Sequence, residues 1–120
     1  MKNIAPHIVR QRFLIEGFYT ISATKEIIDQ YLRDLATELN LRIYGDPIIF
    51  APASGMGKEA NAGFDAFVPL IDSGISLYVW SSSKFLSVMI YTCKNFDDAT
   101  ALEFTKKFFK IEAPTSELSF

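Results

Sequence analysis

Apolar residues follow two periodicities along this chain, one typical of strands and one typical of helices. Runs rich in β-branched and aromatic residues, bounded by Gly, Pro, Asn, Asp or Ser, predict short strands. They occupy residues 12–19, 41–44, 48–50, 64–71, 75–80 and 85–93. Between the first two, residues 22–40 carry apolar side chains at steps of three and four, which predicts an amphipathic helix. Its apolar stripe consists of Ile27, Ile28, Tyr31, Leu32, Leu35 and Leu39.

A second helix is predicted near the C-terminus, from Asp97 or Asp98 to about Lys110. Acidic residues at its start and lysines at its end suit the helix dipole. Short links join the middle strands, which favours antiparallel hairpins. We therefore expect one α+β domain over residues 1–120, a two-layer sandwich with two helices on one face of a mainly antiparallel sheet. The tail after Pro114 is expected to be loose.

Composition narrows the classes of function. The chain has 120 residues, of which 49% are hydrophobic, so it can bury a sizeable core as a single domain. A net charge of −2 argues against a nucleic-acid partner bound through phosphates. An apolar run long enough to span a membrane is absent, as is a signal-peptide core, so we expect a cytoplasmic protein. One cysteine excludes an internal disulfide and a cysteine-based zinc site.

The segment 51–63 is rich in glycine and small residues, which predicts a loop. Its Gly55-Met56-Gly57-Lys58 resembles part of a phosphate-binding loop. The full pattern requires glycine where Pro52 stands and Ser or Thr where Glu59 stands, so this kind of site is excluded. A loop over a pocket and a plain solvated loop both fit the composition.

Three positions are candidates for chemistry. Asp72-Ser73-Gly74 interrupts two apolar runs, and by itself is ordinary turn chemistry. Cys93 ends an apolar strand, where a free cysteine is usually a small buried core residue. Glu16 is the acid within an otherwise apolar strand, either on a solvated face or held near a pocket.

These positions together resemble a known family. Residues 72–80, D-S-G-I-S-L-Y-V-W, resemble the E-S-H-[IL]-[ST]-I-H-T-W-P-E segment of prokaryotic S-adenosylmethionine decarboxylases. Tyr91-Thr92-Cys93 resembles the family's F-T-C, and Cys93 follows Ser73 by 20 positions, as it does in the family. Residues 13–18 resemble the family's opening H-L-x-A-E strand, with Glu16 in the family's register.

The resemblance implies a specific chemistry. The hydroxyl of Ser73 would attack the carbonyl of Asp72, and the chain would split between these residues to leave a pyruvoyl group in place of Ser73. That ketone is the cofactor, an electron sink for decarboxylation of the kind that pyridoxal phosphate supplies elsewhere. Cys93 would protonate the product carbon, and Glu16 would be a further catalytic residue. Asp72, Ser73 and Tyr78 would be the processing residues.

The sequence also departs from the family pattern. Gly74 and Tyr78 stand where the family has histidines, and Ser81-Ser82 stands where it has P-E, whose glutamate is expected to hold the substrate's ribose. The resemblance implies a homodimer in spermidine (polyamine) biosynthesis, acting on S-adenosylmethionine or, without that glutamate, on another amino acid. Two alternatives stay open. One is an unprocessed, non-catalytic homologue that acts as a partner or small-molecule binding protein, and the other is a plain interaction module.

Overall fold

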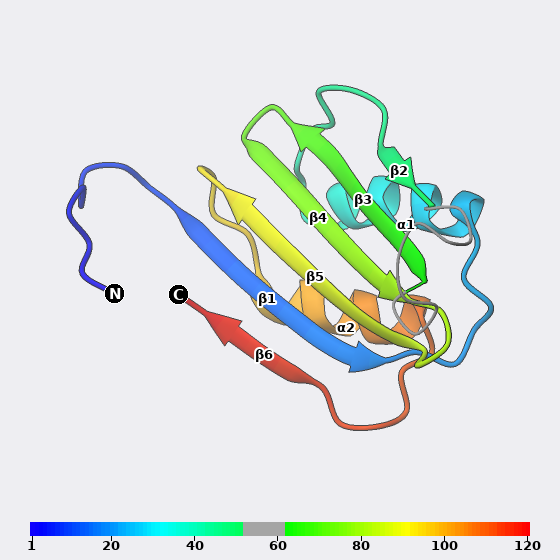
Figure 1. Ribbon diagram of the computed structural model, residues 1–120. Helices are drawn as coiled ribbons and strands as arrows, with labels where there is room; N and C mark the ends of the chain where they lie inside the picture. Colours follow the sequence, from blue (N-terminus) through cyan, green and yellow to red (C-terminus); the bar gives the residue numbers. More distant parts are fainter. Residues whose placement is uncertain (52–61) are drawn as a thin grey trace.

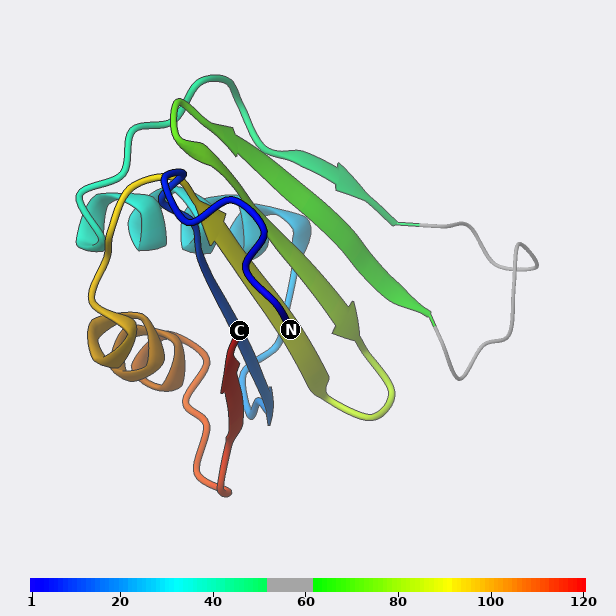
Figure 2. The same cartoon turned by 90° about the vertical axis from the view of Figure 1, so that its left-hand side faces the viewer.

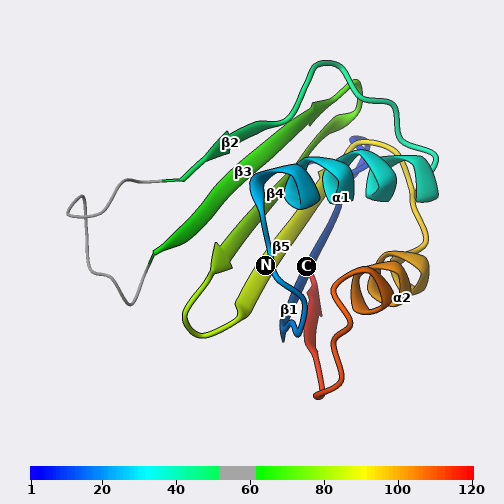
Figure 3. The same ribbon diagram turned by 90° about the vertical axis from the view of Figure 1, so that its right-hand side faces the viewer.

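The computed structural model describes residues 1–51 and 62–120, which form two layers. The described part contains one antiparallel sheet with the strand order β2-β3-β4-β5-β1-β6, and two helices. Both helices lie on the same face of the sheet (Figures 1, 2 and 3). The elements are β1 (Gln11–Phe18), α1 (Lys25–Glu38), β2 (Ile48–Phe50), β3 (Gly63–Leu70), β4 (Ser73–Trp80), β5 (Phe85–Thr92), α2 (Asp98–Phe108) and β6 (Ser116–Ser119). The predicted α+β sandwich is confirmed. Most of the predicted loop 51–63 lies outside the described residues.

The core lies between the sheet and the helices. Along β4, Ile75, Leu77 and Val79 are buried while the residues between them are more exposed, which is the two-residue period of a strand with one covered face. Helix α1 contributes the predicted stripe, and its Tyr31 is fully buried with its hydroxyl 2.7 Å from Thr105 Oγ1 of α2. Burial raises the pKa of this phenol far above its ordinary value. That hydrogen bond joins the two helices inside the core.

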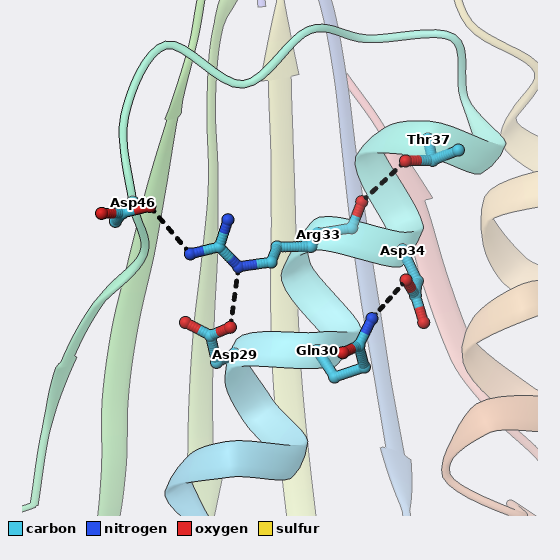
Figure 4. A network of polar contacts seen from close by, with 6 residues as sticks. All are labelled: Asp29, Gln30, Arg33, Asp34, Thr37 and Asp46. Carbon is cyan, nitrogen blue, oxygen red and sulfur yellow. Dashed lines mark hydrogen bonds and ion pairs between the residues drawn. The ribbon is translucent and has the colours of Figure 1, made fainter.

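Caps and surface contacts fix the helix ends. The side chain of Thr24 accepts the backbone N–H of Ile27 at the start of α1, and Asp97 caps α2 in the same way. On the outer side of α1, Arg33 donates to Asp29 at 2.7 Å and to Asp46 at 2.9 Å (Figure 4). Because all three side chains are partly or fully exposed, these ion pairs contribute little stability.

The face of the sheet that carries no helix is called the open face below. The strand register places its residues in rows that cross the sheet. Its side chains are Ile48 and Phe50 of β2, Asp65 and Phe67 of β3, Ser76, Tyr78 and Trp80 of β4, Phe85, Ser87, Met89 and Tyr91 of β5, Arg12, Leu14, Glu16 and Phe18 of β1, and Leu118 of β6. Many of its apolar members are 39–62% exposed, so this face is the main apolar surface of the described chain.

Two expectations about strands were wrong. Residues 41–44 form one isolated bridge, between Ile43 and Leu70, instead of a strand. The tail after Pro114 is not loose, because Ser116–Ser119 pairs with β1 as the edge strand β6. Pairing satisfies backbone groups that β1 would otherwise leave open at the sheet edge. All four residues of β6 are exposed, so no hydrophobic pattern marks the strand in the sequence.

In the two described ranges, the helices are too short or too polar to cross a membrane.

Candidate functional site

Ser73 is the first residue of β4, in a strained backbone conformation. Sequence reasoning placed a turn over Asp72, Ser73 and Gly74, but the turn lies at Ile71 and Asp72, and Ser73 already pairs with Leu70. The φ angle of Ser73 is 134°, a value that residues with a Cβ rarely adopt. Such a conformation costs of the order of 1–3 kcal/mol and is typical of functional sites.

Cys93 lies directly beside Ser73. It follows Thr92, the last residue of β5, which pairs with Ser73 across the sheet. The Ser73 Oγ and Cys93 Sγ atoms are 3.4 Å apart. The backbone N–H of Cys93 also donates to the carbonyl oxygen of Asp72 at 2.8 Å. The thiol is exposed, which excludes a buried core cysteine. The structure therefore brings together Asp72, Ser73 and Cys93.

Tyr78 and Glu16 lie elsewhere on the sheet. Tyr78 is five residues beyond Ser73 on β4, a separation of roughly 16 Å at about 3.3 Å per residue. It shares a row of the open face with Glu16, because each of them pairs with Ser87 of β5. Within one chain, neither side chain reaches the Ser73–Cys93 pair.

Phe67 and Asp65 are two further residues of β3, which the sequence did not single out. Phe67 lies near Ser73, and Asp65 lies in the row of Tyr78 and Glu16. A Cβ added at Gly74 would lie 2.5 Å from a ring carbon of Phe67, so that ring lies over Gly74, next to Ser73. Asp65 pairs directly with Tyr78. Both positions depend on the register of the β3–β4 hairpin, which the sequence does not specify to the residue.

The described residues contain no group of three or more His, Cys, Asp or Glu side chains arranged to hold a metal ion. What these ranges offer is a serine hydroxyl, a thiol and a hydrogen-bonded carbonyl at one peptide bond. That set suits acyl chemistry on the chain itself.

Comparison with known proteins identifies the family. The family model of S-adenosylmethionine decarboxylase matches residues 17–118. The chain belongs to the S-adenosylmethionine decarboxylase family. Ser73 and Cys93 lie inside the matched range, and Glu16 lies one position before it. The predicted resemblance is confirmed.

A solved structure agrees with this assignment at the level of the fold. The crystal structure of the adenosylmethionine decarboxylase from Aquifex aeolicus is similar to this chain, with a TM-score of 0.72 over 94% of this chain and 89% of that one. The two sequences are 19% identical, so the likeness shows the shared sandwich fold. A search of curated proteins found no match.

Proposed function

We propose that this member of the S-adenosylmethionine decarboxylase family is a pyruvoyl-dependent decarboxylase that cleaves itself between Asp72 and Ser73. The observation that carries the proposal is the strained Ser73, whose hydroxyl lies beside Cys93 and whose preceding carbonyl is held by the Cys93 N–H. The family supports the reaction class, and this geometry supports the position of cleavage.

Cleavage would use groups that are already in place. As the Ser73 hydroxyl attacks the Asp72 carbonyl carbon, negative charge develops on the oxygen that the Cys93 N–H binds at 2.8 Å. A preorganised donor at this oxygen lowers the barrier, and the strain at Ser73 is released as the peptide C–N bond breaks. An ester to the Ser73 oxygen results, and the nitrogen of Ser73 takes up a proton.

The ester between Asp72 and Ser73 is then broken by elimination. Removal of the Ser73 Cα proton expels the Asp72 carboxylate and leaves a dehydroalanine, whose nitrogen is released as ammonia on reaction with water. The new N-terminus carries a pyruvoyl group, which supplies a carbonyl that condenses with an amine and accepts electrons as carbon dioxide leaves. The surroundings fit this group, because the exposed Cys93 thiol lies 3.4 Å from the serine oxygen and is placed to deliver a proton to the substrate carbon.

The test is the denatured mass of freshly purified protein. Cleavage predicts two fragments, residues 1–72 and 73–120, with the mass of the second corresponding to an N-terminal pyruvoyl group in place of serine. The two fragments are expected to stay together in the folded protein, because β3 and β4 remain paired on either side of the break. One species with the full mass of 120 residues, persisting on incubation, would contradict the proposal.

The roles of Tyr78 and Glu16 depend on a second chain. Since Tyr78 lies roughly 16 Å along β4 from its own Ser73, a part in processing requires Tyr78 from a partner. We propose a homodimer that packs through the open face. The eight-residue strands of this face are each roughly 26 Å long, and the six strands extend roughly 24 Å from the first to the last. The face therefore covers several hundred Å², of the order of the roughly 800 Å² per partner that stable interfaces bury.

The dimer is testable by placing a charge at the centre of the open face. Met89 lies on β5 in the middle of that face and is half-buried. The substitution Met89→Glu would place two like charges in a shared apolar interface, so the variant is expected to sediment as a monomer where the wild type is a dimer. Tyr44→Glu is the matched control, since Tyr44 is 78% exposed and outside the sheet. Equal sedimentation of wild type and Met89→Glu would contradict the open face as the interface.

The remaining assignments follow from the family and are part of the proposal. The substrate is S-adenosylmethionine, in spermidine biosynthesis, or another amino acid, because Ser82 stands where the family's ribose-binding glutamate is expected. We place the enzyme in the cytoplasm.

The second candidate function is that of an unprocessed homologue that binds a small molecule or a partner. The distance from Tyr78 to Ser73 favours it for an isolated chain, and the mass measurement separates the two.

A further inference from the structure

Thr92 is a polar residue at the end of an apolar series. Every second side chain of β5 points between the sheet and the helices, and Leu86, Val88 and Ile90 fill the first three of these positions. Thr92 takes the fourth and is also fully buried. Valine has nearly the same shape and carries no hydroxyl, which is costly to bury unless it is hydrogen-bonded. The contacts of the hydroxyl therefore show what a threonine provides at this position.

The Thr92 hydroxyl closes a turn around Cys93. It donates to the carbonyl oxygen of Lys94, and it accepts the backbone N–H of Lys94 at 3.3 Å. Each bond joins the residue before Cys93 to the residue after it, so Cys93 is the residue that the turn encloses. Thr92 is the last paired residue of β5. The hydroxyl thus holds the chain at the point where the paired strand has ended.

Two further contacts fix the chain after Cys93. The side-chain amide of Gln11 donates to the Phe96 carbonyl oxygen and accepts the Phe96 N–H, each at 2.9 Å. The ammonium group of Lys94 donates to the carbonyl oxygen of Asn40, near the end of α1, at 2.9 Å. These contacts anchor the far side of the turn to β1 and α1, but they do not connect it to β5.

We propose that Thr92 is a positioning residue for Cys93. The Cys93 N–H donates to the Asp72 carbonyl oxygen at 2.8 Å, and the Cys93 Sγ lies 3.4 Å from the Ser73 Oγ. Both contacts depend on the backbone angles of Cys93, which the Thr92 hydroxyl restricts by fixing Lys94 on the other side. Lys94 is exposed, so water can satisfy its backbone groups when the hydroxyl is missing, but water does not fix their position relative to β5.

The consequence for self-cleavage rests on the proposed function, whereas the effect on the Cys93 N–H does not. Without the Thr92 hydroxyl, this N–H is less often aligned with the Asp72 carbonyl oxygen, where negative charge develops as Ser73 attacks. A displacement of about 1 Å at a reacting centre can lower a rate about 100-fold. We expect loss of the hydroxyl to slow cleavage by about tenfold or more.

The test compares Thr92→Val with Thr92→Ser and Thr105→Val. Thr92→Val keeps the shape and removes the hydroxyl, while Thr92→Ser keeps the hydroxyl. Thr105→Val is the matched control, because Thr105 is equally buried but its hydroxyl bonds Tyr31 between the helices. Loss of that hydroxyl is expected to lower stability without changing the turn at Cys93. Followed by denatured mass against time after synthesis, only Thr92→Val is expected to cleave about tenfold more slowly or worse.

A second readout does not require cleavage. It uses the Ser73→Ala background, where the hydrogen exchange of the Cys93 amide reports how firmly that N–H is bonded. Thr92→Val is expected to speed this exchange about tenfold relative to the amide of Ile90, a buried residue of the same strand. Thr105→Val is expected to leave the ratio of the two exchange rates unchanged.

Unchanged exchange at Cys93 in Thr92→Val would overturn the proposal. Wild-type cleavage that Thr92→Val does not slow, or that Thr92→Ser or Thr105→Val slows equally, would overturn it as well. A wild-type chain that never cleaves would contradict the proposed function alone, because the exchange at Cys93 still decides whether Thr92 positions this residue.

Discussion

Ser73→Ala is expected to leave the chain in one piece and to abolish decarboxylation completely. Alanine has no hydroxyl to attack the Asp72 carbonyl, so neither the ester nor the ketone derived from it can form. The loss is all-or-none, unlike the partial losses that follow removal of a supporting group. Denaturing mass spectrometry gives the first readout, and release of carbon dioxide from labelled S-adenosylmethionine gives the second.

The matched control for this variant is Ser76→Ala. Ser76 lies on the same strand but pairs with Phe67 and Met89 on the open face, away from Cys93. Its loss is expected to change neither readout. Cleavage of Ser73→Ala at the same bond would contradict the proposed chemistry outright.

Cys93→Ala separates the two roles proposed for this residue. The donor to the Asp72 carbonyl is the backbone N–H of Cys93, which alanine retains. We therefore expect cleavage to proceed, while turnover falls about 100-fold or more because the thiol no longer supplies a proton. Loss of cleavage and turnover to the same extent would show that the thiol also acts in processing.

The sequence predicted the layers of this fold well, because local patterns encode them. The apolar stripe from Ile27 to Leu39 fixes a helix with one buried side, and the alternation along 75–80 fixes a strand with one covered face. The strand β6 was not predicted, because no local pattern of apolar residues encodes it. Residues 116–119 bury no side chain, and only backbone pairing with β1 holds them in the sheet. Pairing of this kind leaves no signature in hydrophobicity.

The candidate site was predictable only in part, since a resemblance of motifs carries no distances. The roles that the resemblance implied for Ser73 and Cys93 require the two side chains to be close, and the β4–β5 hairpin register brings them together. The same motif implied a part for Tyr78 in processing, but five residues of extended chain separate it from its own Ser73. The contact of Phe67 with Gly74 depends on the β3–β4 register, which the sequence does not specify to the residue.

Gly74→His, which restores the histidine that the family carries after the serine, is expected to destabilise this chain. The backbone at Gly74 is compatible with a side chain, but the space beside it is taken. A Cβ would lie 2.5 Å from the Phe67 ring and 3.3 Å from the Val68 carbonyl oxygen. Forcing the ring aside overpacks the site, at a cost of about 1–3 kcal/mol in the free energy of unfolding. Urea unfolding measures this directly.

The proposed clash between a side chain at position 74 and the Phe67 ring can be tested by removing the ring. Phe67→Ala deletes the ring, so Gly74→His in that background should cost less, by a coupling of about 1–2 kcal/mol between the two positions. Gly45→His is the matched control, because a Cβ at Gly45 meets only Pro69, at an ordinary 3.6 Å. It is expected to be nearly neutral. Additive effects of Gly74→His and Phe67→Ala would show that the ring is not what excludes a side chain at this position.

A positive coupling would change how the departure at Gly74 is understood. A histidine at that position and the Phe67 ring over it compete for the same space, so this chain holds one arrangement and excludes the other. Its glycine is then one half of a coupled pair with Phe67, and introducing the histidine alone would not make room for it.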